Sequence, residues 1–305
     1  MNPANLARAC LLGVVLASGM RAGEVRPNML LLDGAVAGPA IVAVGERGAI
    51  LRSTDGAHTW QAAESPATTT LTGVSFAADA RHGWAVGHDA LILATADGGV
   101  TWRKQWQGDN LQDSFLDVLA LDARRIIAVG AYGLFVATDD GGRTWTRRKL
   151  SEDDFHFNRL TRGPSGTLYL AGERGTLLRS RDQGGHWNRI DAPYDGSFYG
   201  ILPLGERTLL AHGLRGRIYR STDDGDTWTL VPNENRVLIA TAARLDDQRI
   251  VLGGQSRSLF VSRDAGVTVA PWTPGFTAAV AELVALPDGS ILALGEAGAA
   301  LLPPP

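Results

Sequence analysis

The sequence predicts an all-β fold, a seven-bladed β-propeller whose blades are four-stranded antiparallel sheets. Three observations carry this prediction. A repeat of about 42 residues runs through the chain seven times, and each copy divides into short apolar strands separated by Gly, Asp and polar turn residues. Beyond the N-terminal stretch, no segment keeps the 3.6-residue apolar period of a helix. Repeats of this length with four strands each are typical of propellers, and a solenoid of β-strands, whose repeats are usually shorter, is the alternative.

A signal peptide is expected over residues 1–22. Arg8 supplies a positive start, residues 10–16 are apolar, and residues 17–19 are small enough for peptidase cleavage between Gly19 and Gly23. The alternatives are an ordinary N-terminal helix or strand, and a lipid anchor at Cys10, although that cysteine precedes the apolar run instead of following it. Cleavage would leave residues 23–305 as one propeller domain without cysteine, which suits the periplasm or another extracytoplasmic space.

A glycine fixes the register of the repeat at intervals of 41 to 43 residues. It stands at Gly45, Gly87, Gly130, Gly172, Gly213, Gly254 and Gly295. In the second copy the four strands are LTGVSF, GWAVG, LILAT and TWRKQW. The seventh copy ends at residues 301–305, after its third strand. We expect the segment around residues 24–28 to pair beside this last blade and complete the ring, which would cover an exposed sheet edge.

The turn between the third and fourth strands carries the pattern Ser/Thr-x-Asp-x-Gly-x-Thr-Trp, the Asp-box of the bacterial-neuraminidase type. Its aspartates are Asp55, Asp97, Asp140, Asp182, Asp223 and Asp264, and its tryptophans are Trp60, Trp102, Trp145, Trp187 and Trp228. Each aspartate can accept backbone N–H groups of its own turn, and each indole can pack between blades for about 2 kcal/mol or more. Carboxylates at equivalent turns around a rim cannot converge on one substrate, so we expect a structural role and no catalytic residues.

The turn between the second and third strands carries a recurring arginine. It reads Gly-Glu-Arg-Gly in the first and fourth copies and Gly-Leu-Arg-Gly in the fifth. The residues are Arg47, Arg174 and Arg215, with Arg257 one position further on in the sixth copy. Because the chain reverses at each strand, these turns share a face with the connections between blades. We interpret them as a docking surface for a protein partner, since arginine is enriched at binding hot spots. The alternative is a solvated turn whose arginines pair with neighbouring glutamates.

Four polar residues fall on the strand nearest the central axis. Asp117, Arg159, Tyr199 and Glu282 lie 13 or 14 residues before their register glycines. Such side chains either hydrate the channel or form a central pocket for a small ligand or a peptide end.

Composition excludes several classes of ligand and site. The 305 residues include 29 Lys and Arg against 32 Asp and Glu, which argues against a nucleic-acid-binding protein. A single cysteine excludes a disulfide framework and a cysteine-rich zinc site, and the six histidines show no HxH or HxxxH spacing. We therefore expect no metal and no other cofactor.

The register glycine and the Asp-box occur together in stretches such as AVGERGAILRSTDGAHTW and AVGAYGLFVATDDGGRTW. In this combination the chain, from about residue 28 to residue 302, resembles the photosystem II stability and assembly factor-like propellers. The resemblance implies a seven-bladed, non-enzymatic propeller with a basic patch that helps to assemble a membrane complex by binding a newly made subunit. The chain departs from a full ring of arginines in the second and third copies, which have His88–Asp89 and Ala131–Tyr132 at that position.

We therefore expect an exported, monomeric binding scaffold that serves as an assembly or accessory factor for a membrane protein complex. Relatives in non-photosynthetic bacteria are thought to accompany transporters, so a periplasmic accessory protein of a transport or export system is the first alternative. The second is an Asp-box glycosidase of the sialidase type. The chain lacks the Arg-Ile-Pro string of sialidases, and its even repeats leave little room for the insertions that build such a site.

Overall fold

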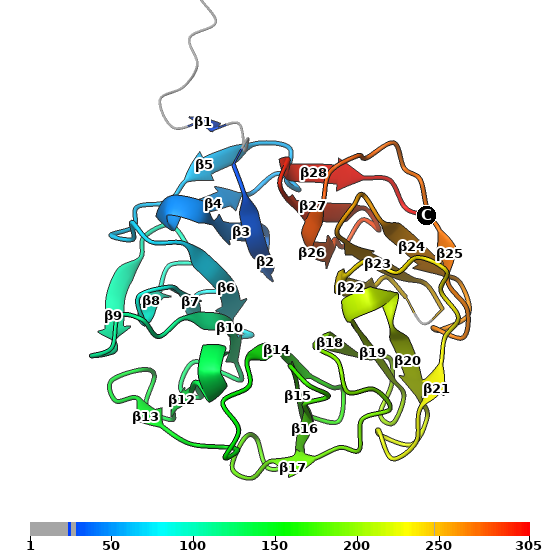
Figure 1. The fold of residues 1–305 in the computed structure, drawn as a ribbon. Coiled ribbons are helices and arrows are strands. Elements are labelled where there is room, and N and C mark those ends of the chain that lie inside the picture. The colour runs from blue at the N-terminus through cyan, green and yellow to red at the C-terminus, as the bar shows by residue number, and fades with distance from the viewer. Residues whose placement is uncertain (1–23, 26–28, 247) are drawn as a thin grey trace, which may run out of the picture.

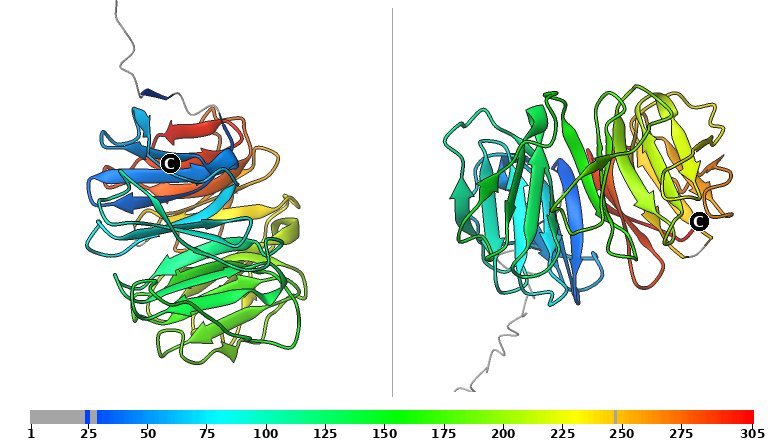
Figure 2. Two further views of the ribbon diagram at one scale, coloured as in Figure 1. Left: turned by 90° about the vertical axis from the view of Figure 1, so that its left-hand side faces the viewer. Right: turned by 90° about the horizontal axis from the view of Figure 1, so that it is seen from below.

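The computed structural model describes residues 24–25, 29–246 and 248–305. In this part of the chain, seven antiparallel sheets stand around a central channel, and the side views show them side by side around the axis (Figures 1 and 2). The predicted seven-bladed β-propeller is confirmed. Within the same residues, no helix is long and apolar enough to span a membrane.

The strands of each blade follow one another outward from the channel. Blade 1 contains β2 (Leu31–Ala37), β3 (Ala40–Gly45), β4 (Ile50–Ser53) and β5 (Trp60–Ala62), with β1 (Glu24–Val25) on its outer edge. Blade 2 contains β6 (Leu71–Phe76), β7 (Gly83–Gly87), β8 (Leu91–Thr95) and β9 (Arg103–Gln107). Blade 3 contains β10 (Phe115–Ala120), β11 (Ile126–Gly130), β12 (Phe135–Thr138) and β13 (Thr146–Arg147).

The second half of the ring repeats this order. Blade 4 contains β14 (Phe157–Arg162), β15 (Leu168–Gly172), β16 (Leu177–Ser180) and β17 (Asn188–Arg189). Blade 5 contains β18 (Phe198–Pro203), β19 (Leu209–Gly213), β20 (Ile218–Ser221) and β21 (Thr229–Leu230). Blade 6 contains β22 (Ile239–Arg244), β23 (Ile250–Gly254), β24 (Leu259–Ser262) and β25 (Ala270–Pro271), and blade 7 contains β26 (Val280–Ala285), β27 (Ile291–Gly295) and β28 (Gly298–Leu302). Single 3₁₀ turns follow three second strands, at Glu46–Gly48 (η1), Ala131–Gly133 (η2) and Leu214–Gly216 (η3).

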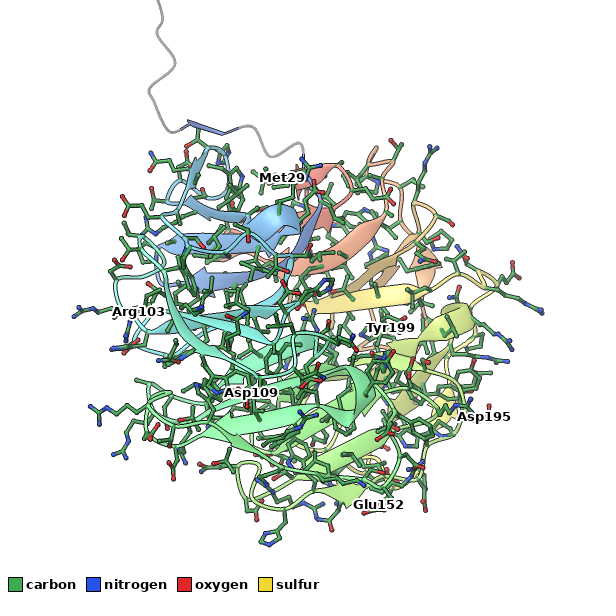
Figure 3. The ribbon with its side chains drawn as sticks, turned by 60° about the vertical axis from the view of Figure 1, so that its left-hand side comes forward. Met29, Arg103, Asp109, Glu152, Asp195 and Tyr199 are labelled. Atoms are coloured by element: carbon green, nitrogen blue, oxygen red, sulfur yellow. The ribbon has the colours of Figure 1, made fainter. Side chains whose placement is uncertain are left out.

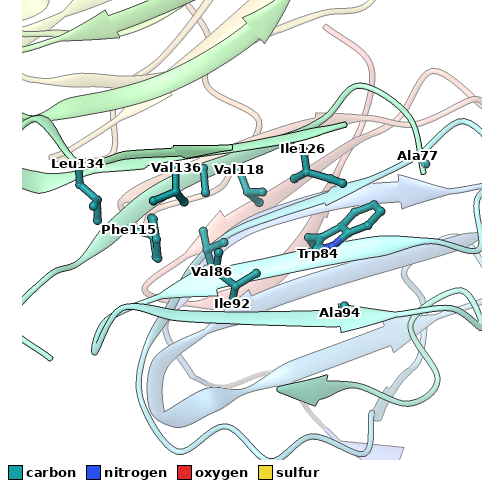
Figure 4. Packing of buried hydrophobic residues seen from close by; sticks show 11 residues of the cluster. Ala77, Trp84, Val86, Ile92, Ala94, Phe115, Val118, Ile126, Leu134 and Val136 are labelled. Carbon is teal, nitrogen blue, oxygen red and sulfur yellow. The ribbon is translucent and has the colours of Figure 1, made fainter. Parts of the chain in front are cut away.

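The core of the molecule lies between blades. Every residue of β7 and of β11 is buried, because each of these strands has a neighbouring blade on both faces. Figure 4 shows one such interface, in which Trp84 and Val86 of blade 2 face Phe115 and Ile126 of blade 3. This placement explains the continuous apolar runs of the second strands, which resemble strands buried on both faces.

The register glycines mark a close approach of two backbones. A Cβ atom at Gly45 would lie 2.1 Å from the carbonyl oxygen of Leu30, and one at Gly87 would lie 2.1 Å from that of Thr70. The connection entering each blade therefore crosses the end of its second strand at a distance that only glycine permits. This steric requirement is the physical origin of the repeat signal in the sequence.

The predicted closure of the ring by the N-terminal segment is wrong. Strand β1 pairs with β5, opposite Trp60 and Gln61, and makes blade 1 five-stranded, whereas blade 7 keeps three strands (Figure 1). Side-chain packing closes the ring instead, since Leu31 and Trp60 of blade 1 pack with Leu292 and Leu294 of blade 7. Burial of apolar surface between two sheet faces requires no shared strand, so backbone pairing across this seam is unnecessary.

Candidate functional site

The Asp-box turns form the same local network in six blades. In blade 1, Asp55 Oδ1 accepts hydrogen bonds from the Thr59 N–H at 2.9 Å and the Ser53 hydroxyl at 2.8 Å, and Oδ2 accepts the Thr59 hydroxyl at 2.6 Å. The bonds from Thr59 to the ionised carboxylate lower the pKa of Asp55 to about 2. Equivalent bonds are made at Asp97, Asp140, Asp182, Asp223 and Asp264. Each aspartate is engaged within its own turn, so this set forms no common site.

The Asp-box tryptophans pack toward the preceding blade. Trp60 is 2% exposed and lies in the cluster that joins blade 1 to blade 7, and Trp102 is 6% exposed between blades 1 and 2. Trp145, Trp187 and Trp228 are half-buried against the clusters they share with blades 2, 3 and 4. In the sixth Asp-box, Val269 takes the corresponding place between blades 5 and 6.

Polar side chains also tie the Asp-box turns of blades 2 to 6 to the blade before each of them. The guanidinium of Arg52 donates from Nε to the Gly98 carbonyl at 2.8 Å, and Arg220 donates to the Ala265 carbonyl at 2.9 Å. Between blades 4 and 5 the link centres on Asp224, which is 7% exposed. It accepts from the Tyr169 hydroxyl, and its Oδ2 lies 3.0 Å from Arg179 Nη1. Structural contacts between neighbouring blades therefore run along the face that carries these turns, here called the Asp-box face.

The opposite face carries the predicted arginines. We call it the connection face, because it holds the turns between second and third strands together with the connections between blades. Arg47, Arg174 and Arg215 adopt left-handed backbone conformations, with φ of 55°, 48° and 57°, and Arg257 has φ of 61°. In η1 both Arg47 and the following Gly48 have positive φ, as a two-residue hairpin turn requires. All four arginines are exposed.

The glutamates beside these arginines do not pair with them. Glu46 Oε1 accepts the N–H of Leu30 at 3.1 Å, and Glu173 Oε2 accepts the N–H of His156 at 3.1 Å. Both carboxylates thus bind the connection that enters their own blade. Within the part of the chain that the structure describes, no ion pair involves any of the four arginines, so the salt-bridged alternative raised by the sequence is not what the structure shows.

Further groups on the connection face complement the arginines. Tyr132, 67% exposed, occupies the arginine position of blade 3 and meets the edge of His156 at 4.8 Å between ring centroids. Beside Arg215, a cavity of about 240 Å³ is lined by Arg217, Arg236 and Asn233. The sequence analysis missed Arg217 and Arg236, because neither stands at the repeated turn position.

The central channel brings together three of the four predicted residues. Arg159 Nη1 lies 3.3 Å from Asp33 Oδ1 and 3.7 Å from Asp117 Oδ1, and the guanidinium also forms an ion pair with Glu282. A cavity of about 250 Å³ opens beside this group. Asp33 escaped the sequence analysis because a shorter first turn places it only 12 residues before its register glycine.

Two of these carboxylates also join neighbouring blades. Asp33 Oδ2 accepts the N–H of Val74 at 2.7 Å, and Asp117 Oδ2 accepts the N–H of Leu160 at 2.7 Å. Burial raises the pKa of Asp117 to about 7, although the charge of Arg159 opposes the shift. Burial likewise raises the pKa of Asp33.

Tyr199 lies outside this group. A bulge between Phe198 and Gly200 leaves Tyr199 unpaired in the ladder, so Gly200 and not Tyr199 holds the position equivalent to Asp117 and Arg159. The half-buried tyrosine, labelled in Figure 3, is not among the residues that line the central cavity. Burial, together with the charge of Glu173, raises the pKa of its hydroxyl. Among the described residues, no three His, Cys, Asp or Glu side chains are grouped to hold a metal ion.

A family model described as the photosynthesis system II assembly factor YCF48 matches residues 53–109 and 104–251, more than half of the chain. The chain belongs to this family. The family expected from the Asp-box repeats is therefore confirmed, and so, at the level of the family, is an assembly-type scaffold instead of an enzyme. No curated protein matches the chain.

Solved structures show the same fold. A structure titled "YCF48 bound to D1 peptide" is 21% identical, with a TM-score of 0.76 over 92% of this chain and 95% of that chain. YCF48 from Cyanidioschyzon merolae is 16% identical, with a TM-score of 0.75 over 92% and 99%. The WD40 β-propeller domain of Doa1 is 9% identical, with a TM-score of 0.73 over 92% and 94%. At these identities the likenesses bear on the fold alone.

Proposed function

We propose that the chain is an exported assembly factor that binds a segment of a membrane protein through its connection face. One observation carries the proposal. Arg47, Arg174, Arg215 and Arg257 are exposed on this face on left-handed turns, and the adjacent carboxylates of Glu46 and Glu173 bind backbone groups instead. Exposed guanidinium groups that no neighbour neutralises suit an acidic partner, because arginine binds carboxylates through two parallel hydrogen bonds.

The cavity beside Arg215 suits the anchoring of a carboxylate. Arg215, Arg217 and Arg236 line it, and Leu230 and Val231 supply an apolar wall. A C-terminal carboxylate or an acidic side chain could enter such a cavity while the apolar part of the residue packs on the wall. A family member solved with a D1 peptide supports a peptide as the kind of ligand.

Export is the second part of the proposal. Residues 1–22, the expected signal peptide, lie outside the described residues, and the remaining chain of 27 basic and 32 acidic residues would act, as a monomer, on the extracytoplasmic side of a membrane. N-terminal sequencing of the protein recovered from the periplasm tests this part. A mature start between residues 20 and 23 is expected, whereas recovery of the intact chain from the cytoplasm would refute export.

The binding experiment is a crosslinking pull-down from membranes with the mature protein as bait. One variant bait carries Arg47→Glu, Arg174→Glu and Arg215→Glu. The control carries Arg81→Glu, Arg143→Glu and Arg263→Glu, three exposed arginines of the Asp-box face, so both baits have the same net charge.

Capture of a membrane protein by the wild type and the control, with at least a tenfold loss in the connection-face variant, supports the proposal. Equal capture by all three baits would overturn it. Recovery of a transporter as the captured protein would replace the assembly role with the accessory role expected from bacterial relatives.

A further inference from the structure

The central channel holds more negative than positive side chains. Asp33, Asp117 and Glu282 face a single guanidinium, that of Arg159. The side chains of the two aspartates are 6% and 5% exposed, and that of Glu282 is 12% exposed. Three carboxylates in a poorly hydrated place are stable only when enough positive charge or bound protons accompany them. One arginine does not supply that charge.

A buried histidine adds an unused acceptor to the same cavity. His212 is 3% exposed, and its Nδ1 lies 3.1 Å from the carbonyl oxygen of Ile239, which can only accept. Nδ1 therefore carries the hydrogen, and since burial lowers the pKa of His212 to about 4, the neutral ring leaves Nε2 as a hydrogen-bond acceptor at neutral pH.

The free nitrogen of His212 is directed at the space beside Gly200. A Cβ atom at Gly200 would lie 2.6 Å from Nε2, and both residues line the central cavity. Within the described residues, no donor is bonded to Nε2. The nearby hydroxyl of Thr241 is occupied, because it donates to Glu282 and accepts the N–H of Leu283. The cavity thus presents acceptors and negative charge, whereas its one cationic side chain is already paired.

We propose that the central channel binds a protonated primary amine. An alkylammonium group is compact, carries one positive charge and offers three N–H donors with no acceptor, which complements the carboxylates and His212 Nε2. The cavity of about 250 Å³ can admit the end of an amine chain. An anion is disfavoured by the charge of the walls.

Proton release should accompany binding. Five titratable side chains face the cavity from five blades: Asp33, Asp117, Arg159, His212 and Glu282. Because the pKa of Asp117 is about 7 and that of Asp33 is raised, the empty site retains a proton near neutral pH that the ammonium ion replaces. Affinity should therefore rise between pH 6 and pH 8, by up to about tenfold per pH unit below the pKa.

The test is isothermal calorimetry of the mature protein with n-butylammonium chloride at pH 6 and pH 8. Butan-1-ol serves as the neutral ligand of matched size, and sodium chloride at equal ionic strength controls for screening. The variants are Asp117→Asn, which keeps an acceptor for the Leu160 N–H, and His212→Leu. Tyr199→Phe, at a residue outside the cavity lining, is the control. Titrations with putrescine and with N-acetyl-lysine amide distinguish a free small amine from a lysine side chain as the source of the ammonium group.

We expect butylammonium to bind and butanol not to bind, with a higher affinity for butylammonium at pH 8 than at pH 6. This affinity should fall at least fivefold in Asp117→Asn and stay unchanged in Tyr199→Phe. No binding of any amine at either pH, or equal binding of butanol, would overturn the proposal. If His212→Leu fails to fold, the proposal is still tested by the affinity of the wild type at the two pH values and by the Asp117→Asn variant. The triple connection-face variant should bind the amine like the wild type, so failure of the docking proposal leaves this result unaffected.

Discussion

The interface between blades 4 and 5 and the seam between blades 7 and 1 are held together differently. At the first, the buried carboxylate of Asp224 meets Tyr169 and Arg179 from the neighbouring blade. At the seam, β28 has Leu301 where β4 has Arg52, and the contact is the apolar cluster around Trp60. Most of the ring combines apolar burial with polar links, whereas the closing seam relies on burial.

The inner strands repeat this contrast. Asp33 and Asp117 each accept a backbone N–H of the following blade, and Thr241 accepts that of Leu283 at 3.2 Å. Glu282 holds the equivalent position in blade 7, but its carboxylate pairs with Arg159 and Thr241 and, among the described residues, accepts no backbone N–H of blade 1. The comparison teaches that ring closure depends on apolar packing around Trp60, without the polar links that accompany such packing at the interface between blades 4 and 5.

Replacement of Trp60 by alanine should have the largest effect. The side chain is 2% exposed at the seam, so its loss should lower the free energy of unfolding by about 3 to 5 kcal/mol. Trp228→Ala is the matched variant, because Trp228 is only half-buried and Asp224 links the same blades. Urea unfolding followed by circular dichroism measures both. A larger loss for Trp228→Ala than for Trp60→Ala would contradict the contrast between the two interfaces.

Asp224→Asn should weaken the interface between blades 4 and 5. Removing the charge leaves the largely buried Arg179 with only the exposed carboxylate of Asp226, 3.5 Å away, as an ion-pair partner, for an expected loss of about 2 to 3 kcal/mol. Arg181→Ala serves as the control, since the Arg181 side chain is 62% exposed and its ion pair with Asp224 should contribute little. A double-mutant cycle with Tyr169→Phe measures the coupling. Additive effects of the two substitutions would show that the link is not cooperative.

Asp117→Asn should change how stability depends on pH. In the folded protein the pKa of Asp117 is about 7, above the value of about 4 in an unfolded chain, so between these values only the native state holds the proton. The wild type should therefore lose about 3 kcal/mol relative to Asp117→Asn as pH rises from about 4 to 7. Thermal unfolding of both proteins across this range provides the measurement. A difference in stability between the two proteins that does not change with pH would contradict this expectation. It would show that neighbouring groups fully compensate the charge of the Asp117 carboxylate.

The smallest effect is expected at the Asp-boxes. Asp97→Ala and Asp264→Ala each remove a carboxylate that accepts from a threonine N–H and hydroxyl, at a cost of about 1 kcal/mol. The losses should be equal, although the sixth box has Val269 in place of tryptophan, because the hydrogen bonds are the same. Paired urea curves check this expectation. A much smaller loss of stability for Asp264→Ala would show that the stabilisation by an Asp-box depends on its tryptophan.

Spacing in the sequence predicted the blades because each repeat has the same close backbone contact, which only a glycine at the register position permits. It predicted the faces on which the arginines and Asp-boxes lie because strand reversal fixes them. It failed where the count from the register glycine differs from 13. Tyr199 stands 14 residues before Gly213, at the bulged position that recurs in every blade, and a short turn places Asp33 only 12 residues before Gly45. The sequence could not predict how the ring closes, because an extended N-terminal segment can pair with the outer edge of blade 1 or with that of blade 7.

The left-handed turns of the connection face have a consequence for how this surface can diversify. Arg47, Tyr132 and Arg215 share one backbone conformation, with φ between 54° and 57°, although their side chains differ in charge and shape. The strain of that conformation is already accommodated by the hairpin, and the side chain at this point contributes nothing to the core. Evolution or an engineer can therefore rewrite the specificity of the surface one blade at a time, with the scaffold left untouched.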